Sequence, residues 1–476
     1  MSAETRRRWR APLLLFAIVW LSCTWFGSWA FNPNNATRLF AALAIVERGT
    51  ARIDEYAGMT IDRAEVDGHF LMDKAPGITL MAIPFVAATN ALTGETSAEQ
   101  PHVFYDRQME AFLRLRMRIV IAFTVAVLTA FAATALLDLG TRMTGSRGAG
   151  LFAALSYGLG TIAWGWSTTI FGHAPVAALF VIAIWATWRA TGGGPPGRFA
   201  ALAGLALGWA VVVEHPAAMT GAPIALWALW RVRRWERPAR WRTIGIAAAA
   251  GLAALIPLFA YNILAFGHPL AVGYSNVVGF DGMKQGFFGL TYPKPEILYE
   301  ITLGQRRGLI WVAPVLALAP YGLWILLRDR ARRDLGVMLV AGALAALLYN
   351  AAYVYWEGGY ATGPRHAVPA IAYLAVALAA FWQDANRVEK WLGGVFLTAS
   401  IAINLTIAAA EILAPDFLKA PLTEQIIPQF LIGNIRTVPS EFWGWSTASG
   451  LWLYLAIAAM LAGGLAWAIR DESEDR

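Results

Sequence analysis

Long apolar stretches recur along the whole chain and are separated by shorter polar segments. A helix of about 20 apolar residues is long enough to cross a bilayer. Stretches near that length lie at residues 11–31, 117–138, 149–171, 174–189, 198–213, 217–231, 243–265, 308–327, 335–354, 366–383, 391–413 and 449–469. The pattern predicts an all-α polytopic membrane protein with about 12 transmembrane helices. We expect residues 1–476 to form a single integral membrane domain.

The first apolar stretch, 11–31, follows the basic segment MSAETRRRWR, an arrangement that a secretory signal peptide also has. The apolar run is long for a signal peptide and lacks a clear small-residue cleavage site. We therefore interpret it as a transmembrane helix that enters the membrane from the cytoplasm.

Charged residues between the spans predict the orientation of the chain. Short Arg-rich segments follow every second span, at 141–147, 189–198, 231–242, 328–333, 383–390 and 470–476. Cytoplasmic loops of membrane proteins carry an excess of Lys and Arg. We therefore expect both termini in the cytoplasm of a bacterial cell, and the loops 32–116, 266–307 and 414–448 on the periplasmic side of the inner membrane.

A further apolar stretch, 76–93, would reverse this arrangement for every later loop if it crossed the membrane. It contains Pro76 and Pro84, which suit a short or kinked helix. We expect it to lie at the outer interface, or to enter the membrane without crossing.

Composition agrees with a membrane protein. Hydrophobic residues make up 58% of the chain and charged residues 14%, below the roughly 25% of soluble domains. The 22 Trp and 24 Phe suit lipid-facing surfaces and interfacial belts. The net charge of +7 is explained by the basic cytoplasmic loops, so we expect no nucleic-acid partner. The chain has one cysteine, Cys23, and therefore no intrachain disulfide.

The first outer segment, 32–116, concentrates polar side chains beside apolar stretches. Residues 36–49 have helical apolar spacing and end in Gly49, which predicts an amphipathic helix on the membrane. Acidic residues follow, and one of the five lysines then lies at the edge of an apolar stretch. The acids are Asp54, Glu55, Asp62, Asp67 and Asp73, and the lysine is Lys74. Exposure of a loop to water would explain any single acid, but it explains the group of five less well.

Two other outer loops combine glycines with cations and aromatic residues. The segments are YEITLGQRRGLIW (299–311) and YWEGGYATGPRHAVP (355–369). Glycine lets a backbone approach a ligand closely, and the guanidinium group suits phosphate. Arginines that snorkel to the interface are the alternative, but outer arginines are disfavoured by the charge rule. We select Arg306, Arg307, Trp356, Glu357, Tyr360, Arg365 and His366 as candidates for binding an anionic ligand.

Two outer helix ends carry a polar residue each. His173 begins one span, and Glu214 ends the next; a polar helix cap is the alternative explanation for both. The histidines show no HxH or HxxxH spacing, so we predict no metal site.

The order of these features resembles the GT-C superfamily of polyprenyl-phosphate-sugar-dependent glycosyltransferases, near the aminoarabinose transferases and protein O-mannosyltransferases. DKAPG at 73–77 is similar to the family segment whose lysine contacts the donor phosphate. TRLFAALAIVERG at 37–49 resembles the first juxtamembrane helix. Relatives open that helix with a catalytic Asp, whereas this chain has Asn34 and Asn35, and asparagine cannot act as a base.

The resemblance implies transfer of a sugar from a polyprenyl-phosphate carrier to a lipid, glycan or protein acceptor. The departing phosphate needs no acid, so one general base and several cations suffice. The implied bases are Asp54, then Asp62, with Glu55 beside them, and in-line attack would invert the anomeric centre. The implied phosphate ligands are Lys74, Arg306, Arg307, Arg365 and His366. The implied sugar or acceptor contacts are His173, Trp356, Glu357 and Tyr360.

Two other functions fit the sequence. A flippase or transporter of lipid-linked sugars would place charged residues and broken helices near the bilayer midplane, whereas these spans carry few charges. An inactive assembly partner would explain Asn34 and Asn35. No cofactor is required by the sequence, although a divalent cation remains an open alternative.

Overall fold

The computed structural model describes residues 3–27 and 32–473. The first helix, α1 (Ala3–Trp25), ends before the apolar stretch does. The expected end of the first span near residue 31 lies outside the described residues, as do the last three residues of the basic segment 470–476.

Helices that could cross a membrane make up most of the bundle. In the described residues, eight segments are long and apolar enough. They contain α4 (Arg107–Phe123) with α5 (Val125–Thr144), α8 (His173–Thr191), α9 (Pro196–Val213), α12 (Arg237–Phe266), α16 (Arg333–Ala352), η6 (Arg365–Ala367) with α17 (Val368–Asp384), α18 (Arg387–Ala410) and α21 (Thr447–Ser473). The predicted all-α polytopic membrane fold is confirmed, and the count of about 12 spans stays a prediction.

Three of the expected spans are broken rather than continuous. The stretch 149–171 divides into α6 (Arg147–Gly158) and the single turn α7 (Ala163–Trp166). The stretch 217–231 divides into α10 (Ala217–Thr220) and α11 (Ala222–Val232) at Gly221. The stretch 308–327 divides into α14 (Leu309–Val312), η5 (Pro314–Leu318) and α15 (Ala319–Arg328). Pro314 has no amide hydrogen to continue the helix of α14.

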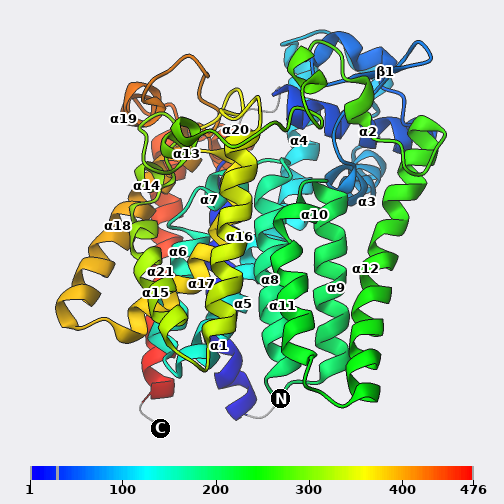
Figure 1. Ribbon diagram of the computed structural model, residues 1–476. Coiled ribbons are helices and arrows are strands. Elements are labelled where there is room, and N and C mark those ends of the chain that lie inside the picture. The colour runs from blue at the N-terminus through cyan, green and yellow to red at the C-terminus, as the bar shows by residue number, and fades with distance from the viewer. Residues whose placement is uncertain (1–2, 28–31, 474–476) are drawn as a thin grey trace.

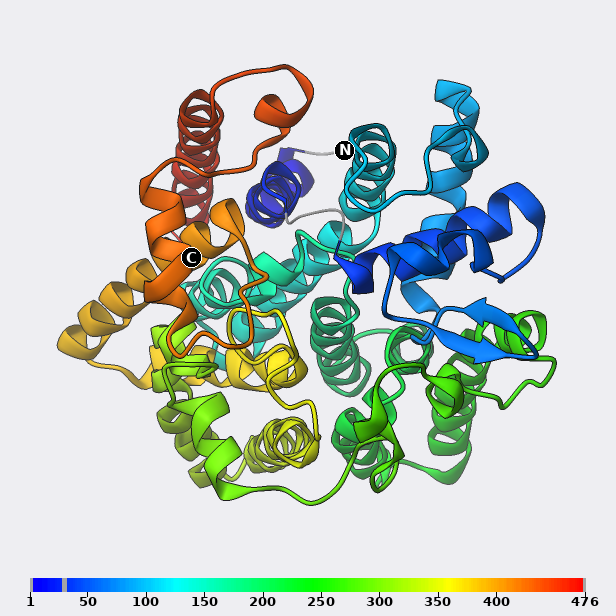
Figure 2. The same cartoon turned by 90° about the horizontal axis from the view of Figure 1, so that it is seen from above.

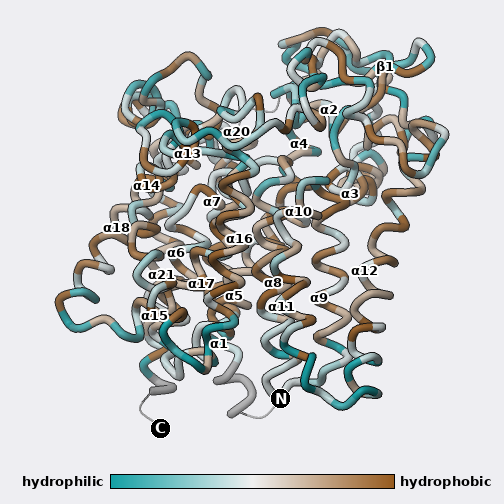
Figure 3. Tube along the Cα trace, in the orientation of Figure 1, coloured by the Kyte–Doolittle hydropathy of each residue, from teal (hydrophilic) through white to brown (hydrophobic). Residues whose placement is uncertain are grey.

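The two ends of the bundle differ in character. The start of α1 and the end of α21 lie at the lower end in Figure 1, whereas α2, α3, α13, α19 and the hairpin of β1 gather at the upper end. Hydrophilic residues concentrate at these two ends, and the helices between them are largely hydrophobic (Figure 3). This arrangement is the one expected of a bundle that spans a bilayer.

The first outer segment folds into short elements on the upper end. They are α2 (Pro33–Arg48), η1 (Asp54–Met59), β1 (Ala64–Val66), β2 (His69–Leu71), α3 (Gly77–Thr93) and η2 (Ser97–Glu99). The two strands pair antiparallel with Glu65 opposite Phe70. Their turn uses Asp67 and Gly68, both at positive φ. The hairpin directs the chain back toward the bundle just before Asp73 and Lys74.

Helix α2 is more enclosed than its amphipathic pattern predicted. The side chain of Asn32 caps its start by accepting hydrogen bonds from the Asn34 and Asn35 amides. Gly49 ends it in the left-handed conformation, as expected. Every residue from 34 to 44 is buried, because η1 and α3 pack against the helix. It therefore lies under other outer elements rather than directly on the bilayer.

The remaining outer elements come from distant parts of the chain. They are η3 (Gly273–Asn276), η4 (Asp281–Lys284), α13 (Pro295–Thr302), the π-helical turn η7 (Leu422–Ile426), α19 (Ile427–Leu431) and α20 (Val438–Phe442). Seen from above, the segment of η3 and η4 lies beside the β1–β2 hairpin (Figure 2), and Ala64 forms a bridge with Val277. These elements surround the site described next.

Candidate active site

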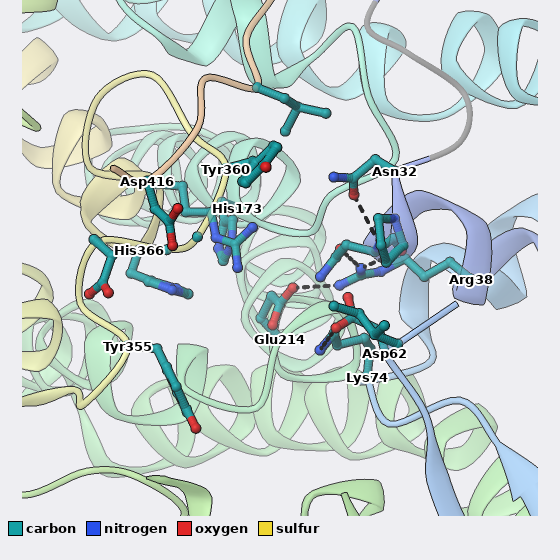
Figure 4. Close-up of a pocket in the computed structure, with 18 of the residues that line it drawn as sticks. Asn32, Arg38, Asp62, Lys74, His173, Glu214, Tyr355, Tyr360, His366 and Asp416 are labelled. Carbon is teal, nitrogen blue, oxygen red and sulfur yellow. Dashed lines mark hydrogen bonds and ion pairs between the residues drawn. The ribbon is translucent and has the colours of Figure 1, made fainter. Parts of the chain in front are cut away.

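A cavity of about 850 Å³ opens at the upper end of the bundle. Its walls come from the start of α2, the segments just before and after the hairpin, the start of α8, the turn after α9, the segment of η3 and η4, the end of α16 and the loops 353–366 and 410–436. A volume of this size suits a sizeable organic ligand. Figure 4 shows that the charged side chains of these segments point into the same space.

Lys74 lies on the cavity wall between two carboxylates. Its Nζ is 2.7 Å from Oδ2 of Asp73 and 3.4 Å from Oδ1 of Asp62. Burial raises the pKa of the Asp73 carboxyl to about 6, while the Lys74 ammonium opposes the rise. Burial alone would lower the pKa of Lys74, but the two carboxylates raise it, so this amine stays charged at neutral pH.

Close packing fixes the position of Lys74. The chain after Lys74 enters α3 at Gly77, which lies against the backbone of Val213 at the end of α9. A Cβ at Gly77 would lie 2.6 Å from the Val213 backbone, so a larger residue would push the two segments apart. The fit explains how a loop lysine is held at one place on the wall.

Arg38 and Glu214 form a second buried ion pair in the cavity. Nη2 of Arg38 is 2.9 Å from Oε1 of Glu214, and the two side chains are 1% and 12% exposed. Arg38 also donates hydrogen bonds to the backbone and side-chain oxygens of Asn34, one helical turn earlier. Burial raises the pKa of Glu214, and Arg38 opposes the rise. Arg38 thus links Asn34 of its own helix to a carboxylate at the end of α9.

A glycine makes room for the Glu214 side chain. Any Cβ at Gly172, which precedes α8, would clash with the Glu214 carboxylate. The turn before His173 therefore depends on glycine at this point.

Arg365, His366 and His173 form the opposite wall. The imidazole rings of His173 and His366 lie 5.0 Å apart, and the ring of Tyr353 lies 5.1 Å from that of His366. The Arg365 guanidinium lies over Phe171 at 5.2 Å. In the described part of the chain, Arg365 has no carboxylate within ion-pair distance, unlike Arg38 and Lys74.

Several buried polar atoms of the cavity have no hydrogen-bond partner among the described residues. They are Nε of Arg38, Oδ1 of Asp73, Oε2 of Glu357, Nε of Arg365, Nε2 of His366 and Oε1 of Gln425. An unpaired buried polar atom costs about 1–3 kcal/mol. Six such atoms at one cavity indicate a site shaped for a polar ligand.

Aromatic residues form the side of the cavity nearest η3 and η4. They are Tyr274, Phe280, Phe288, Tyr349, Tyr353 and Tyr355. Burial raises the pKa values of Tyr274 and Tyr353, so both phenols stay protonated at neutral pH. The cavity therefore has a charged side and an aromatic side, a combination suited to a ligand with a phosphate and a sugar.

The cavity brings together part of the set expected from the sequence. Asp62, Lys74, His173, Glu357, Tyr360, Arg365 and His366 line it. Asp54, Glu55, Arg306, Arg307 and Trp356 are not among the lining residues.

Asp54 and Glu55 contact neighbouring outer elements instead. The Asp54 carboxylate, 43% exposed, accepts from the Phe70 amide at 2.5 Å and contacts Nδ1 of His69 at 2.9 Å, both in the hairpin. Glu55 pairs with Arg48 at the end of α2. Neither acid lines the cavity.

Arg306, Arg307 and Trp356 lie behind the wall. Arg307 is fully buried and donates to the carbonyl oxygens of Glu357 and Gly359 at 2.9 and 3.0 Å. Burial lowers the pKa of its guanidinium to about 10. Arg306 donates to the Asp416 carbonyl and lies over the Trp356 ring. The two arginines hold the loop that carries Glu357, rather than facing the cavity themselves.

Sequence reasoning missed Arg38 as a site residue. Its signal was an arginine one turn after Asn34 in an otherwise apolar helix. Glu214 was noticed only as a helix end, and its contact with Arg38 crosses 176 positions.

A metal site was not expected from the histidine spacing. Among the described residues, no group of three or more His, Cys, Asp or Glu is arranged to hold a metal ion. No step of the chemistry below is assigned to one.

This architecture is similar to that of solved structures, although no sequence match is found. No protein-family model and no curated protein sequence matches the chain. Among solved structures, ArnT from Cupriavidus metallidurans bound to undecaprenyl phosphate is similar with a TM-score of 0.55 and 13% identity, over 96% of this chain and 75% of that one. The archaeal oligosaccharyltransferase AglB from Archaeoglobus fulgidus gives a TM-score of 0.47 and 12% identity, over 83% of this chain and 55% of that one. The similarity to ArnT confirms the expected GT-C-like fold.

Proposed function

We propose that the chain is a membrane glycosyltransferase. It moves a sugar from a polyprenyl-phosphate carrier to a lipid, glycan or protein acceptor. The observation that carries this proposal is the cavity that Lys74, Arg38 and Arg365 line together with buried polar atoms that have no partner among the described residues. The chain shares its GT-C-like fold with ArnT, whose structure holds undecaprenyl phosphate, and this similarity supports the same function.

The donor phosphate binds where Lys74, Arg38 and Arg365 converge. Lys74 supplies a point charge and Arg365 a guanidinium that has no carboxylate partner among the described residues. When the phosphate binds, one of its oxygens replaces Asp62 or Asp73 as a contact of the Lys74 amine. These fixed cations then stabilise the charge that grows on the phosphate as the sugar leaves. The bond from the anomeric carbon to the phosphate oxygen breaks, and the phosphate keeps the electron pair.

Asp62 acts as the general base. It is the expected acid that lines the cavity, and its carboxylate lies 3.4 Å from Nζ of Lys74. The reacting carbon is one bond from the phosphate, so a base beside Lys74 can reach the incoming hydroxyl. Attack opposite the phosphate inverts the anomeric centre. Asp73 and Glu214 are further carboxylates in this part of the cavity, but Lys74 pairs closely with the first and Arg38 holds the second.

The sugar lies between the histidine wall and the aromatic side. His366 and His173 donate or accept hydrogen bonds to sugar hydroxyls, with Glu357 beside them. Tyr360 and Tyr353 offer faces on which a pyranose ring can stack. Arg307 positions the loop of Glu357 from behind, and Trp356 packs against Arg306.

The site faces the periplasm of a bacterial cell in this proposal. The start of α1 and the end of α21 lie at the opposite end of the bundle (Figure 1), and the Arg-rich segments support a cytoplasmic location for that end. The outer loops 32–116, 266–307 and 414–448 would then face the periplasm.

A turnover assay tests the proposal against its rivals. The purified chain is reconstituted in liposomes with a radiolabelled polyprenyl-phosphate sugar and a bacterial envelope extract as the source of acceptor, and release of sugar from the carrier is measured together with its movement across the bilayer. A transferase cleaves the sugar–phosphate bond with wild-type protein and fails to do so with Asp62→Asn. Movement without cleavage would establish a flippase, and neither cleavage nor movement would indicate an assembly partner.

A further inference from the structure

A second groove lies between α11 and α16, which pack side by side near the end of the bundle that carries both termini. Its volume is about 730 Å³. It is separate from the candidate active site, with which it shares no lining residue.

Two helix faces form the apolar walls of this groove. Pro223, Leu226, Trp227 and Trp230 of α11 recur at positions i, i+3, i+4 and i+7, which places them on one face. The α16 residues Asp334, Val337, Met338 and Ala341 recur with the same spacing. Among the described residues no side chain fills the space between these faces, and Leu226 and Val337 are 66% and 54% exposed.

Five arginines line the same groove toward its polar end. They are Arg231, Arg233 and Arg234 at the end of α11, Arg330 before α16 and Arg333 at its start. The single acid in the lining is Asp334, and its carboxylate already accepts from Trp227 at 2.9 Å and pairs with Arg231 at 3.3 Å. Four arginines therefore have no carboxylate among the lining residues to neutralise them.

The charge rule for loops does not explain this arrangement by itself. It accounts for arginines on this side of the membrane, but not for their gathering over a groove with two apolar faces. The Arg233 guanidinium carbon lies over the Trp230 ring at 3.3 Å from its centroid, and Arg333 donates to the Leu327 carbonyl at 2.8 Å. Both guanidinium groups are thus held at the edge of the groove.

We propose that this groove binds an anionic phospholipid. The headgroup phosphate contacts Arg233, Arg234, Arg330 and Arg333, and an acyl chain lies along Leu226, Val337 and Ala341. Guanidinium groups suit phosphate geometry, and basic pockets between transmembrane helices are known to take anionic headgroups. The charge of the rim and the apolar walls both match a diacyl lipid rather than free phosphate.

Native mass spectrometry of the delipidated full-length chain tests the proposal. The protein is titrated with dioleoyl phosphatidylglycerol, cardiolipin, dioleoyl phosphatidylcholine and inorganic phosphate. We expect saturable adducts with the two anionic lipids and weaker binding of phosphatidylcholine. Equal binding of the neutral lipid, or phosphate that competes as well as the lipids do, would overturn the proposal.

Charge-removing variants locate the bound lipid. Arg234→Gln with Arg330→Gln removes two exposed arginines that make no contact on which the fold depends. At about 1 kcal/mol for each cation, anionic-lipid affinity should fall roughly 30-fold. The matched control, Arg387→Gln with Lys390→Gln at the start of α18, removes the same charge outside the groove. An equal loss in both double variants would show that the lipid binds by net charge alone.

A groove-filling variant tests the apolar part separately. Ala341 is exposed on the groove face of α16, so Ala341→Trp adds bulk there without crowding the core. It should lower the affinity for the same anionic lipids while leaving sugar transfer unchanged. Undiminished lipid binding in Ala341→Trp would contradict a lipid chain in this groove.

Discussion

Nζ of Lys74 lies 3.4 Å from the Asp62 carboxylate, on the wall of a cavity that also contains Arg38 and Arg365. The pair joins the proposed phosphate ligand to the proposed base. Since both groups are held by a short hairpin and the start of α3, their separation is set before any ligand binds. Such pre-organisation is what catalysis by fixed charges requires.

Replacement of Lys74 should abolish most turnover. Lys74→Met removes the amine but keeps an unbranched side chain, and the loss of one preorganised donor should lower kcat by about 10²–10³. The matched control is Lys284→Met, because that lysine is 80% exposed and lies outside the cavity. Sugar release is measured for both variants at equal protein. Full activity in Lys74→Met would remove this lysine from the mechanism.

The two aspartates of the first outer segment should behave differently. Asp62→Asn should lower kcat by about 10²–10⁴, since an amide accepts no proton, while donor binding persists. Asp54→Asn alters an exposed carboxylate that bonds to the hairpin, so it should leave kcat within about two-fold of wild type. Steady-state kinetics of both variants show which of the two aspartates determines kcat. If Asp54→Asn lowered kcat more than Asp62→Asn, the base would be Asp54, the first choice from the sequence.

The buried Arg38–Glu214 pair should show strong coupling in stability. Either Arg38→Met or Glu214→Leu alone leaves an uncompensated buried charge, which should cost about 3–5 kcal/mol. The double variant removes both charges and should be more stable than the sum of the single effects predicts. Thermal or denaturant unfolding in detergent measures this cycle. Additive losses would mean that the pair does not interact in the folded protein.

Donor binding should strengthen as pH falls through about 6. Burial raises the pKa of Asp73 to about 6, so acid neutralises a carboxylate that competes with the donor for Lys74. Binding of an anion favours the protonated form of Asp73, which makes the complex take up a proton. The affinity for a non-reactive polyprenyl phosphodiester, whose charge is constant here, should rise from pH 8 to pH 5. Asp73→Asn should bind tightly at every pH. If the affinity of this variant depended on pH as that of the wild type does, Asp73 would not be the titrating group.

Most of the transmembrane architecture could be predicted from the sequence, because unbroken apolar runs such as those of α12, α18 and α21 have a single stable form in a bilayer. The breaks could not be predicted as readily. The apolar pattern continues through Gly221 and Pro314, where the helices end. Glycine and proline occur often in transmembrane helices, so neither residue marks a break by itself.

Part of the candidate site could also be predicted from the sequence. Asp62 and Lys74 lie twelve positions apart in the first outer segment, on either side of the hairpin, so both could be selected from the sequence. Arg38 and Glu214 meet only because the start of α2 approaches the end of α9, and that packing has no local signal. The sequence ranked Asp54 ahead of Asp62 as the base. In the structure Asp54 bonds to Phe70 and His69 of the hairpin, whereas Asp62 lines the cavity.

A structure of the purified chain with undecaprenyl phosphate tests the central claim most directly. The account predicts the phosphate inside the cavity, with an oxygen about 2.7–2.9 Å from Nζ of Lys74, as expected for a charge-assisted hydrogen bond. The guanidinium of Arg365 should also face it. A lipid phosphate bound elsewhere on the molecule, with the cavity wall of Lys74, Asp62 and Asp73 unchanged, would contradict the account.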